Sequence, residues 1–137
     1  VPAAVGVRDG RATCVELACP PAASDSALGA ALAVARKLAP VVVTTRAEGD
    51  TPLLSALAAT LGDVASAAGH IDAAPWTDAF AGYARAAADA SAAGRLFRNA
   101  DADVLAIHAF GFPRHLGGPL HQVRLREAGD SKPGADR

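Results

Sequence analysis

The chain has 137 residues, and this length fits one domain or two very small ones. Hydrophobic residues make up 51% of it and aromatic residues only 4%, while alanine alone accounts for about a quarter, which is typical of a helix-rich globular protein. Because 13 basic side chains face 14 acidic ones and the formal net charge is -1, we expect neither nucleic acid nor a membrane surface as a partner.

The first predicted element is a strand over residues 12–18, which read ATCVELA and are followed by Pro20 and Pro21. Ser24 and Asp25 then precede a helix over 27–39, whose apolar residues recur at steps of three and four. The β-branched run at 41–45 predicts a strand buried on both faces. Together these elements form a βαβ unit with a parallel strand pair.

After the polar RAEGDT at 46–51, the sequence becomes alanine-rich and changes to helical spacing. We expect helices at about 52–68, 76–96 and 101–110, the first of them capped by Thr51. The charged, turn-rich AGDSKPGADR at 128–137 predicts a tail. The chain therefore divides into an α/β part at 1–48, a helical lobe at 49–127 and the tail.

Glu16 is the main candidate site residue, because it is a carboxylate within an otherwise apolar strand. Near the end of such a strand, a carboxylate can orient a histidine in a ligand-binding crevice. The alternative is an ordinary strand residue that faces solvent. Sequence alone does not choose between these interpretations.

The segment FGFPRHLGGPLH, residues 110–121, has two prolines and three glycines and predicts a fixed, non-helical path. It is either a wall against a ligand or neighbouring domain, or a helix terminator that places Phe110 and Phe112 in the core. Three histidines lie in or near it, but their spacing matches no common metal motif: His108, His115 and His121.

Cys14 and Cys19 form neither a Cys-x-x-Cys pair nor half of a zinc site, and we expect buried free thiols. The sequence contains no glycine-rich nucleotide loop, hydrolase elbow or phosphate loop. No run of roughly 18 apolar residues and no apolar signal core occur either, so we expect a cytoplasmic protein.

Two stretches resemble, in the same order, parts of the 3-hydroxyacyl-CoA dehydrogenase family, especially the multifunctional β-oxidation enzymes. CVELACPPAASDSALGAALAVARKLAPVVVTT resembles the end of the family's NAD-binding domain, and ADADVLAIHAFGFPRHLGGPLH resembles its C-terminal helical module. Together they cover about half of the chain. The resemblance implies a partial βαβ unit of a Rossmann-like sheet, followed by an all-helical lobe.

By this resemblance, Glu16 corresponds to the carboxylate that orients the family's catalytic histidine, which lies about a dozen residues earlier. Residues 2–5 read PAAV at that place, so the histidine is absent. The family's Pro-Gly-Phe motif and substrate-holding asparagine are also absent from RAEGDTPLLSAL. The chain alone should therefore be inactive, and NAD is implied by resemblance only, since no residue of this chain is assigned to bind it.

The sequence and the resemblance lead to three alternative functions. The first is a part of an NAD-linked 3-hydroxyacyl-CoA dehydrogenase of fatty acid β-oxidation, completed by sequence outside this chain. It would act on an acyl-CoA substrate and form a homodimer, or pair with the remainder of a multifunctional chain, through apolar helix faces at 52–96. The second is a catalytically degenerate acyl-CoA-binding or dimerisation module. The third is a helical domain with an incidental βαβ unit and no ligand.

Overall fold

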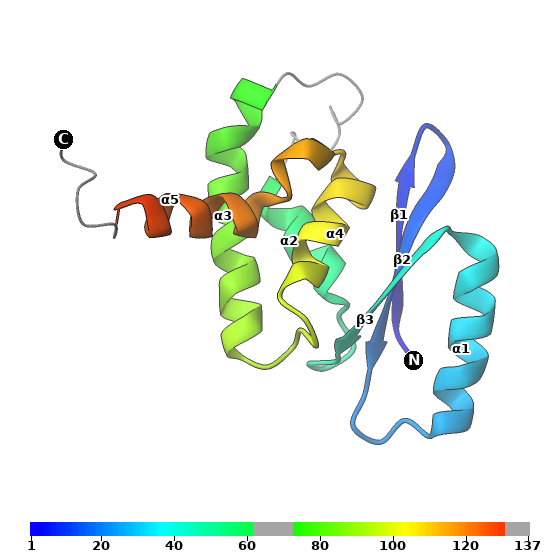
Figure 1. Cartoon of the computed structure of the whole chain (residues 1–137). Helices are drawn as coiled ribbons and strands as arrows, with labels where there is room; N and C mark the ends of the chain where they lie inside the picture. The colour runs from blue at the N-terminus through cyan, green and yellow to red at the C-terminus, as the bar shows by residue number, and fades with distance from the viewer. Residues whose placement is uncertain (62–72, 131–137) are drawn as a thin grey trace.

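The described part of the chain combines a three-stranded sheet with five α-helices (Figure 1). The computed structural model describes residues 1–61 and 73–130. In chain order the elements are β1 (Ala3–Arg8), β2 (Arg11–Cys19), α1 (Asp25–Leu38), β3 (Val41–Arg46), α2 (Leu53–Leu61), α3 (Ala73–Ala92), α4 (Ala100–Phe110), a 3-10 turn (Arg114–Leu116) and α5 (Pro119–Asp130).

The predicted mixed α/β architecture and the parallel β2–α1–β3 unit are confirmed. Helix α1 begins where the Ser24 hydroxyl accepts a hydrogen bond of 3.1 Å from the Ala27 amide. It ends before Pro40, which lacks an amide hydrogen and cannot continue the helix. Arg36 and Lys37 in its last turn complement the helix dipole.

Strand β1 is an element that our prediction missed. It pairs antiparallel with β2 through a two-residue loop, Asp9-Gly10, in which both residues have positive φ. An Asp-Gly pair suits such a hairpin turn because both positions tolerate that backbone conformation. The sheet order is therefore β1-β2-β3, with β2 in the centre.

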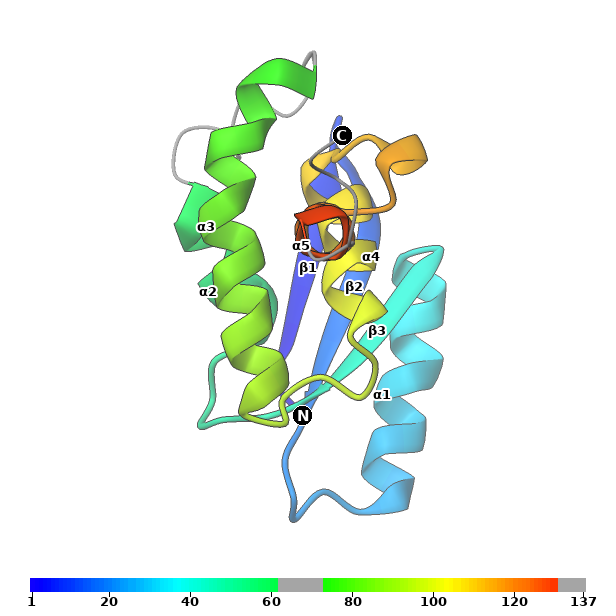
Figure 2. The ribbon, with the colours of Figure 1, turned by 60° about the vertical axis from the view of Figure 1, so that its left-hand side comes forward.

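Helix α1 covers one face of the sheet, and α2 to α5 lie on the opposite side (Figures 1 and 2). Successive side chains of β2 point to opposite faces of the sheet, as in any pleated strand. Val15 and Leu17 pack with Ala35 and Ala39 on the α1 side. Cys14 belongs to the larger core on the helical side, which is formed mostly by α2, α3 and α4.

Helix α5 was also missed by our prediction. It begins at the buried Pro119 and runs to Asp130, three residues into the segment predicted as a tail. Proline at a first helical position loses no helical hydrogen bond, because the first amides of a helix have no intrahelical partner. The predicted helix over 52–68 is seen as α2, and residues 62–68 lie outside the described part.

The 110–121 segment acts as a helix terminator, as one of the two interpretations proposed. Gly111 closes α4 in the left-handed conformation, and Phe110 and Phe112 are buried on either side of it. The Phe112 ring meets Phe80 edge-on, with 4.8 Å between centroids. Tyr83 lies in the same cluster and donates a hydrogen bond of 2.7 Å to the Ala102 carbonyl.

We predict that Gly6→Ala destabilises the fold and that Gly29→Ala does not. A Cβ at Gly6 would lie 2.6 Å from the Cys14 sulfur and 2.8 Å from the Ala109 Cβ, whereas one at Gly29 meets nothing within 4 Å. Overpacking at Gly6 should lower the free energy of unfolding by about 1–3 kcal/mol. Gly29→Ala, inside α1, should raise it by about 0.5–1 kcal/mol.

Urea denaturation of both variants measures these changes. Equal effects of the two substitutions would contradict a close β1–α4 contact at Gly6.

Candidate functional site

Glu16 lies in the centre of β2, and its side chain is fully buried. The alternative of a solvent-facing strand residue is therefore wrong. Its carboxylate points to the helical side of the sheet and reaches the start of α2. The site consequently joins the sheet to the helical layer.

The Glu16 carboxylate accepts hydrogen bonds from three donors. The Thr45 hydroxyl donates to Oε1 at 2.6 Å, and the Leu53 amide donates to the same oxygen at 2.8 Å. The Leu54 amide donates to Oε2 at 2.5 Å. Leu53 and Leu54 are the first residues of α2, so Glu16 supplies acceptors for amides that have no partner within the helix. The positive end of the helix dipole also favours a carboxylate there.

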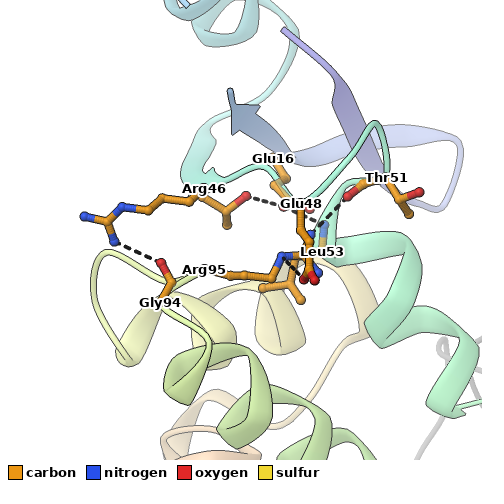
Figure 3. A network of polar contacts seen from close by, with 8 residues as sticks. Glu16, Arg46, Glu48, Thr51, Leu53, Gly94 and Arg95 are labelled. Carbon is orange, nitrogen blue, oxygen red and sulfur yellow. Dashed lines mark hydrogen bonds and ion pairs between the residues drawn. The ribbon is translucent and has the colours of Figure 1, made fainter. Parts of the chain in front are cut away.

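A second set of polar contacts lies close to the Glu16 carboxylate and connects two loops (Figure 3). The Arg46 amide donates to the Arg95 carbonyl at 2.7 Å, and the Arg46 guanidinium donates to the Gly94 carbonyl at 3.0 Å. The Arg95 guanidinium donates to the Thr51 carbonyl at 3.0 Å, and its Nε lies 3.7 Å from Glu48. These contacts tie the loop after α3 to the loop between β3 and α2.

The residue opposite Glu16 in the β1–β2 register is Ala4. The three donors that bind the Glu16 carboxylate are two backbone amides and a hydroxyl, and none of them is a histidine. A general base needs a group that exchanges protons near neutral pH, usually a histidine held by such a carboxylate. The contacts described for Glu16 therefore position a helix and provide no proton relay.

A groove of about 220 Å³ lies next to this position, between β1 and α2. Its floor includes the C-terminal end of α4. The lining residues are Ala4, Val5, Gly6, Val7, Leu54, Ser55, Ala58, Ala109 and Phe110. The groove could not be predicted from the sequence, because it depends on β1, which was itself not predicted.

Asp103 on α4 is a second buried carboxylate and was not predicted from sequence. It accepts hydrogen bonds from the amides of Leu120 at 2.8 Å and His121 at 3.1 Å, at the start of α5. Burial raises its pKa, while those two amides and the charges of His121 and Arg124 act in the opposite direction. Gly118 packs so closely on Asp103 that a Cβ there would clash.

The three histidines named from sequence lie on different elements: His108 on α4, His115 in the 3-10 turn and His121 on α5. Burial is the largest cause that lowers the pKa of His108, followed by the charges of Arg114 and Arg8. Within residues 1–61 and 73–130, no group of three or more His, Cys, Asp or Glu side chains is placed to hold a metal ion.

Cys14 is a buried free thiol, as predicted. Cys19 is also free but only half-buried, so the prediction that both thiols are buried is wrong for Cys19. Burial raises the pKa of both thiols. A raised pKa keeps a thiol protonated and unreactive near neutral pH. Cys14 also belongs to the larger hydrophobic core, so its role is packing.

No protein-family model, curated protein or solved structure matches this chain. None of the described helices is both long enough and apolar enough to cross a membrane.

We predict that Glu16→Gln lowers the free energy of unfolding by about 2 kcal/mol. The NH2 group of glutamine would replace one carboxylate oxygen and leave a buried backbone N–H without an acceptor. Glu48→Gln is the matched control, since the Glu48 side chain is 74% exposed and its ion pair is 3.7 Å long. That control should change stability by less than about 0.5 kcal/mol. Urea denaturation measures both, and equal losses would show that Glu16 does not anchor α2.

We also predict a pH dependence from Asp103. Because its pKa is raised above the usual 3.8, the folded protein binds this proton more tightly than the unfolded chain does. The contribution of Asp103 to stability is complete below 3.8 and is lost as the pH rises through its folded-state pKa. Asp103→Asn removes that contribution. Urea denaturation across this pH range should show that the unmodified chain loses stability relative to the variant as the pH rises. A gain of relative stability with rising pH would contradict a raised pKa of Asp103.

Proposed function

We propose that this chain is a catalytically degenerate relative of the 3-hydroxyacyl-CoA dehydrogenases that binds acyl-CoA. The sequence resemblance supplies the ligand class. The β1–β2 register supports the proposed loss of catalysis. It pairs Glu16 with Ala4, at the place where the resemblance expects a catalytic histidine.

The state of Glu16 supports the same conclusion. Its carboxylate is fully buried, and both of its oxygens accept hydrogen bonds, from Thr45, Leu53 and Leu54. A carboxylate used in this way stabilises the junction of β2, β3 and α2. The groove beside Ala4 is the space that an acyl-CoA molecule would enter.

The second candidate is a working NAD-linked dehydrogenase, of which this chain is one part. The parallel β2–α1–β3 unit favours it, because such a unit fits the end of a Rossmann-like NAD-binding domain. In this reading the histidine and nucleotide loop come from polypeptide outside this sequence, and helical lobes pair as a homodimer. Both candidates go with a cytoplasmic location.

The experiment that separates the candidates combines binding and turnover. Isothermal titration calorimetry of the 137-residue chain with acetoacetyl-CoA should give saturable binding. The same chain with 3-hydroxybutyryl-CoA and NAD should produce no NADH, because no described histidine lies opposite Glu16. Ala58→Trp, which fills the groove from α2, should weaken the binding, whereas the exposed Glu48→Gln should not.

The second candidate predicts no NADH from this chain alone either, so turnover is also measured on the purified native polypeptide. An intact mass well above 13.7 kDa together with NADH production from the same substrates would establish the second candidate. Absence of acetoacetyl-CoA binding would overturn the binding function in both candidates.

A further inference from the structure

The outer edge of β1 presents backbone groups to the groove. The Ala18 amide donates to the Pro2 carbonyl at 2.9 Å, and Ala4 and Gly6 lie opposite Glu16 and Cys14. In an antiparallel pair, alternate residues direct their N–H and C=O toward the partner strand. Pro2, Ala4 and Gly6 face β2 in this way, so Val5 directs its N–H and C=O outward. No strand in the described part lies beyond β1.

The shape of the groove favours a narrow, extended ligand. Its volume of about 220 Å³ is below the roughly 300–1,000 Å³ typical of sites that enclose drug-sized ligands. One wall is the β1 edge, and the other is the α2 surface formed by Leu54, Ser55 and Ala58. A chain that lies along this edge needs amide groups to pair with the outward backbone of Val5.

Two basic residues lie near one end of the groove. None of the residues that line it is acidic. At the Val7 end, β1 finishes at Arg8, and the charges of Arg8 and Arg114 both act on His108. The hydroxyl of Thr13 on β2 donates to the His108 carbonyl at 2.5 Å and holds this end of α4 against the hairpin. Asp9 in the turn is the nearest acidic residue in sequence, and it is exposed. This end suits an anionic group.

We propose that the β1 edge binds the pantetheine phosphate arm of acyl-CoA, with its amides paired to the Val5 backbone, its phosphates beside Arg8 and Arg114, and its thioester at the Ala4 end. This assignment rests on the proposed function and adds the position and direction of the ligand. Extended backbone covers about 3.3 Å per residue, so Ala4 and Arg8 are about 13 Å apart along β1. A pantetheine arm is an extended chain with two amides, a thiol at one end and a phosphate at the other.

The test is calorimetric titration of the 137-residue chain with coenzyme A and with pantetheine, which lacks the phosphates. Val5→Pro removes the outward N–H without removing a hydrogen bond to β2, because proline is tolerated where an edge strand faces away from its partner. This variant should bind coenzyme A about ten-fold more weakly, whereas the matched Val5→Thr keeps the N–H and should stay within about two-fold. Pantetheine should bind about ten-fold more weakly than coenzyme A, and Arg8→Gln should reduce that difference.

The outcomes separate this inference from the proposed function. If Val5→Pro and the unmodified chain bind coenzyme A equally, the β1 edge is not the site, although acyl-CoA binding stands. If the unmodified chain binds neither acetoacetyl-CoA nor coenzyme A, both proposals are wrong. If circular dichroism shows Val5→Pro unfolded, the Val5 amide is followed by NMR in the unmodified chain instead. Protection of that amide from hydrogen exchange by coenzyme A supports the inference, and unchanged exchange overturns it.

Other occupants of the groove also give defined results. Concentration-dependent self-association that coenzyme A does not affect and Val5→Pro abolishes would assign the edge to a second copy of the chain. Displacement of coenzyme A by an acetylated Glu-Glu-Val-Thr-Val peptide at lower concentration would assign it to an acidic peptide. Either result would overturn the proposal.

Discussion

The arrangement of the described chain depends on how the buried Glu16 carboxylate is satisfied. An ionised carboxylate without partners costs several kcal/mol in a protein interior. Here Thr45 from β3 and two amides from α2 provide its hydrogen bonds, so one side chain of β2 sets the positions of both neighbouring elements. Loss of any of these donors would leave a buried charge undersatisfied. The sheet and the helical layer are therefore joined by a polar contact inside an otherwise apolar core.

Asp103 repeats the same arrangement within the helical layer. Its carboxylate on α4 accepts the first amides of α5, just as Glu16 accepts those of α2. In both cases the carboxylate comes from a distant part of the chain and replaces the local capping residue that most helices use. α1, with Ser24 as its own cap, follows the local rule. Two of the helices thus begin where tertiary structure brings an acceptor to them.

Strand β1 is covered incompletely on both faces of the sheet. Helix α1 packs on β2 and β3 and leaves Val5 and Val7 of β1 exposed at 46% and 57%. The helical side is filled to the edge of β1 by α2 and α4, where the groove begins. Natural proteins rarely leave an uncharged sheet edge without protection. An edge of this kind beside a groove is therefore a natural place to look for a partner or ligand.

The sequence by itself determined the elements whose signals are local. The cap at Ser24, the stop at Pro40 and the Val-rich strand were readable because each depends on neighbouring residues. The Asp9-Gly10 hairpin was also readable in principle, but the small residues Ala3, Ala4 and Gly6, which have low strand propensity, hid β1. The role of Glu16 was different. Its donors are 29 to 38 residues away, so only the tertiary structure decided that this carboxylate is buried and caps a helix. The groove likewise exists only once β1, α2 and α4 come together, because no single element contains it.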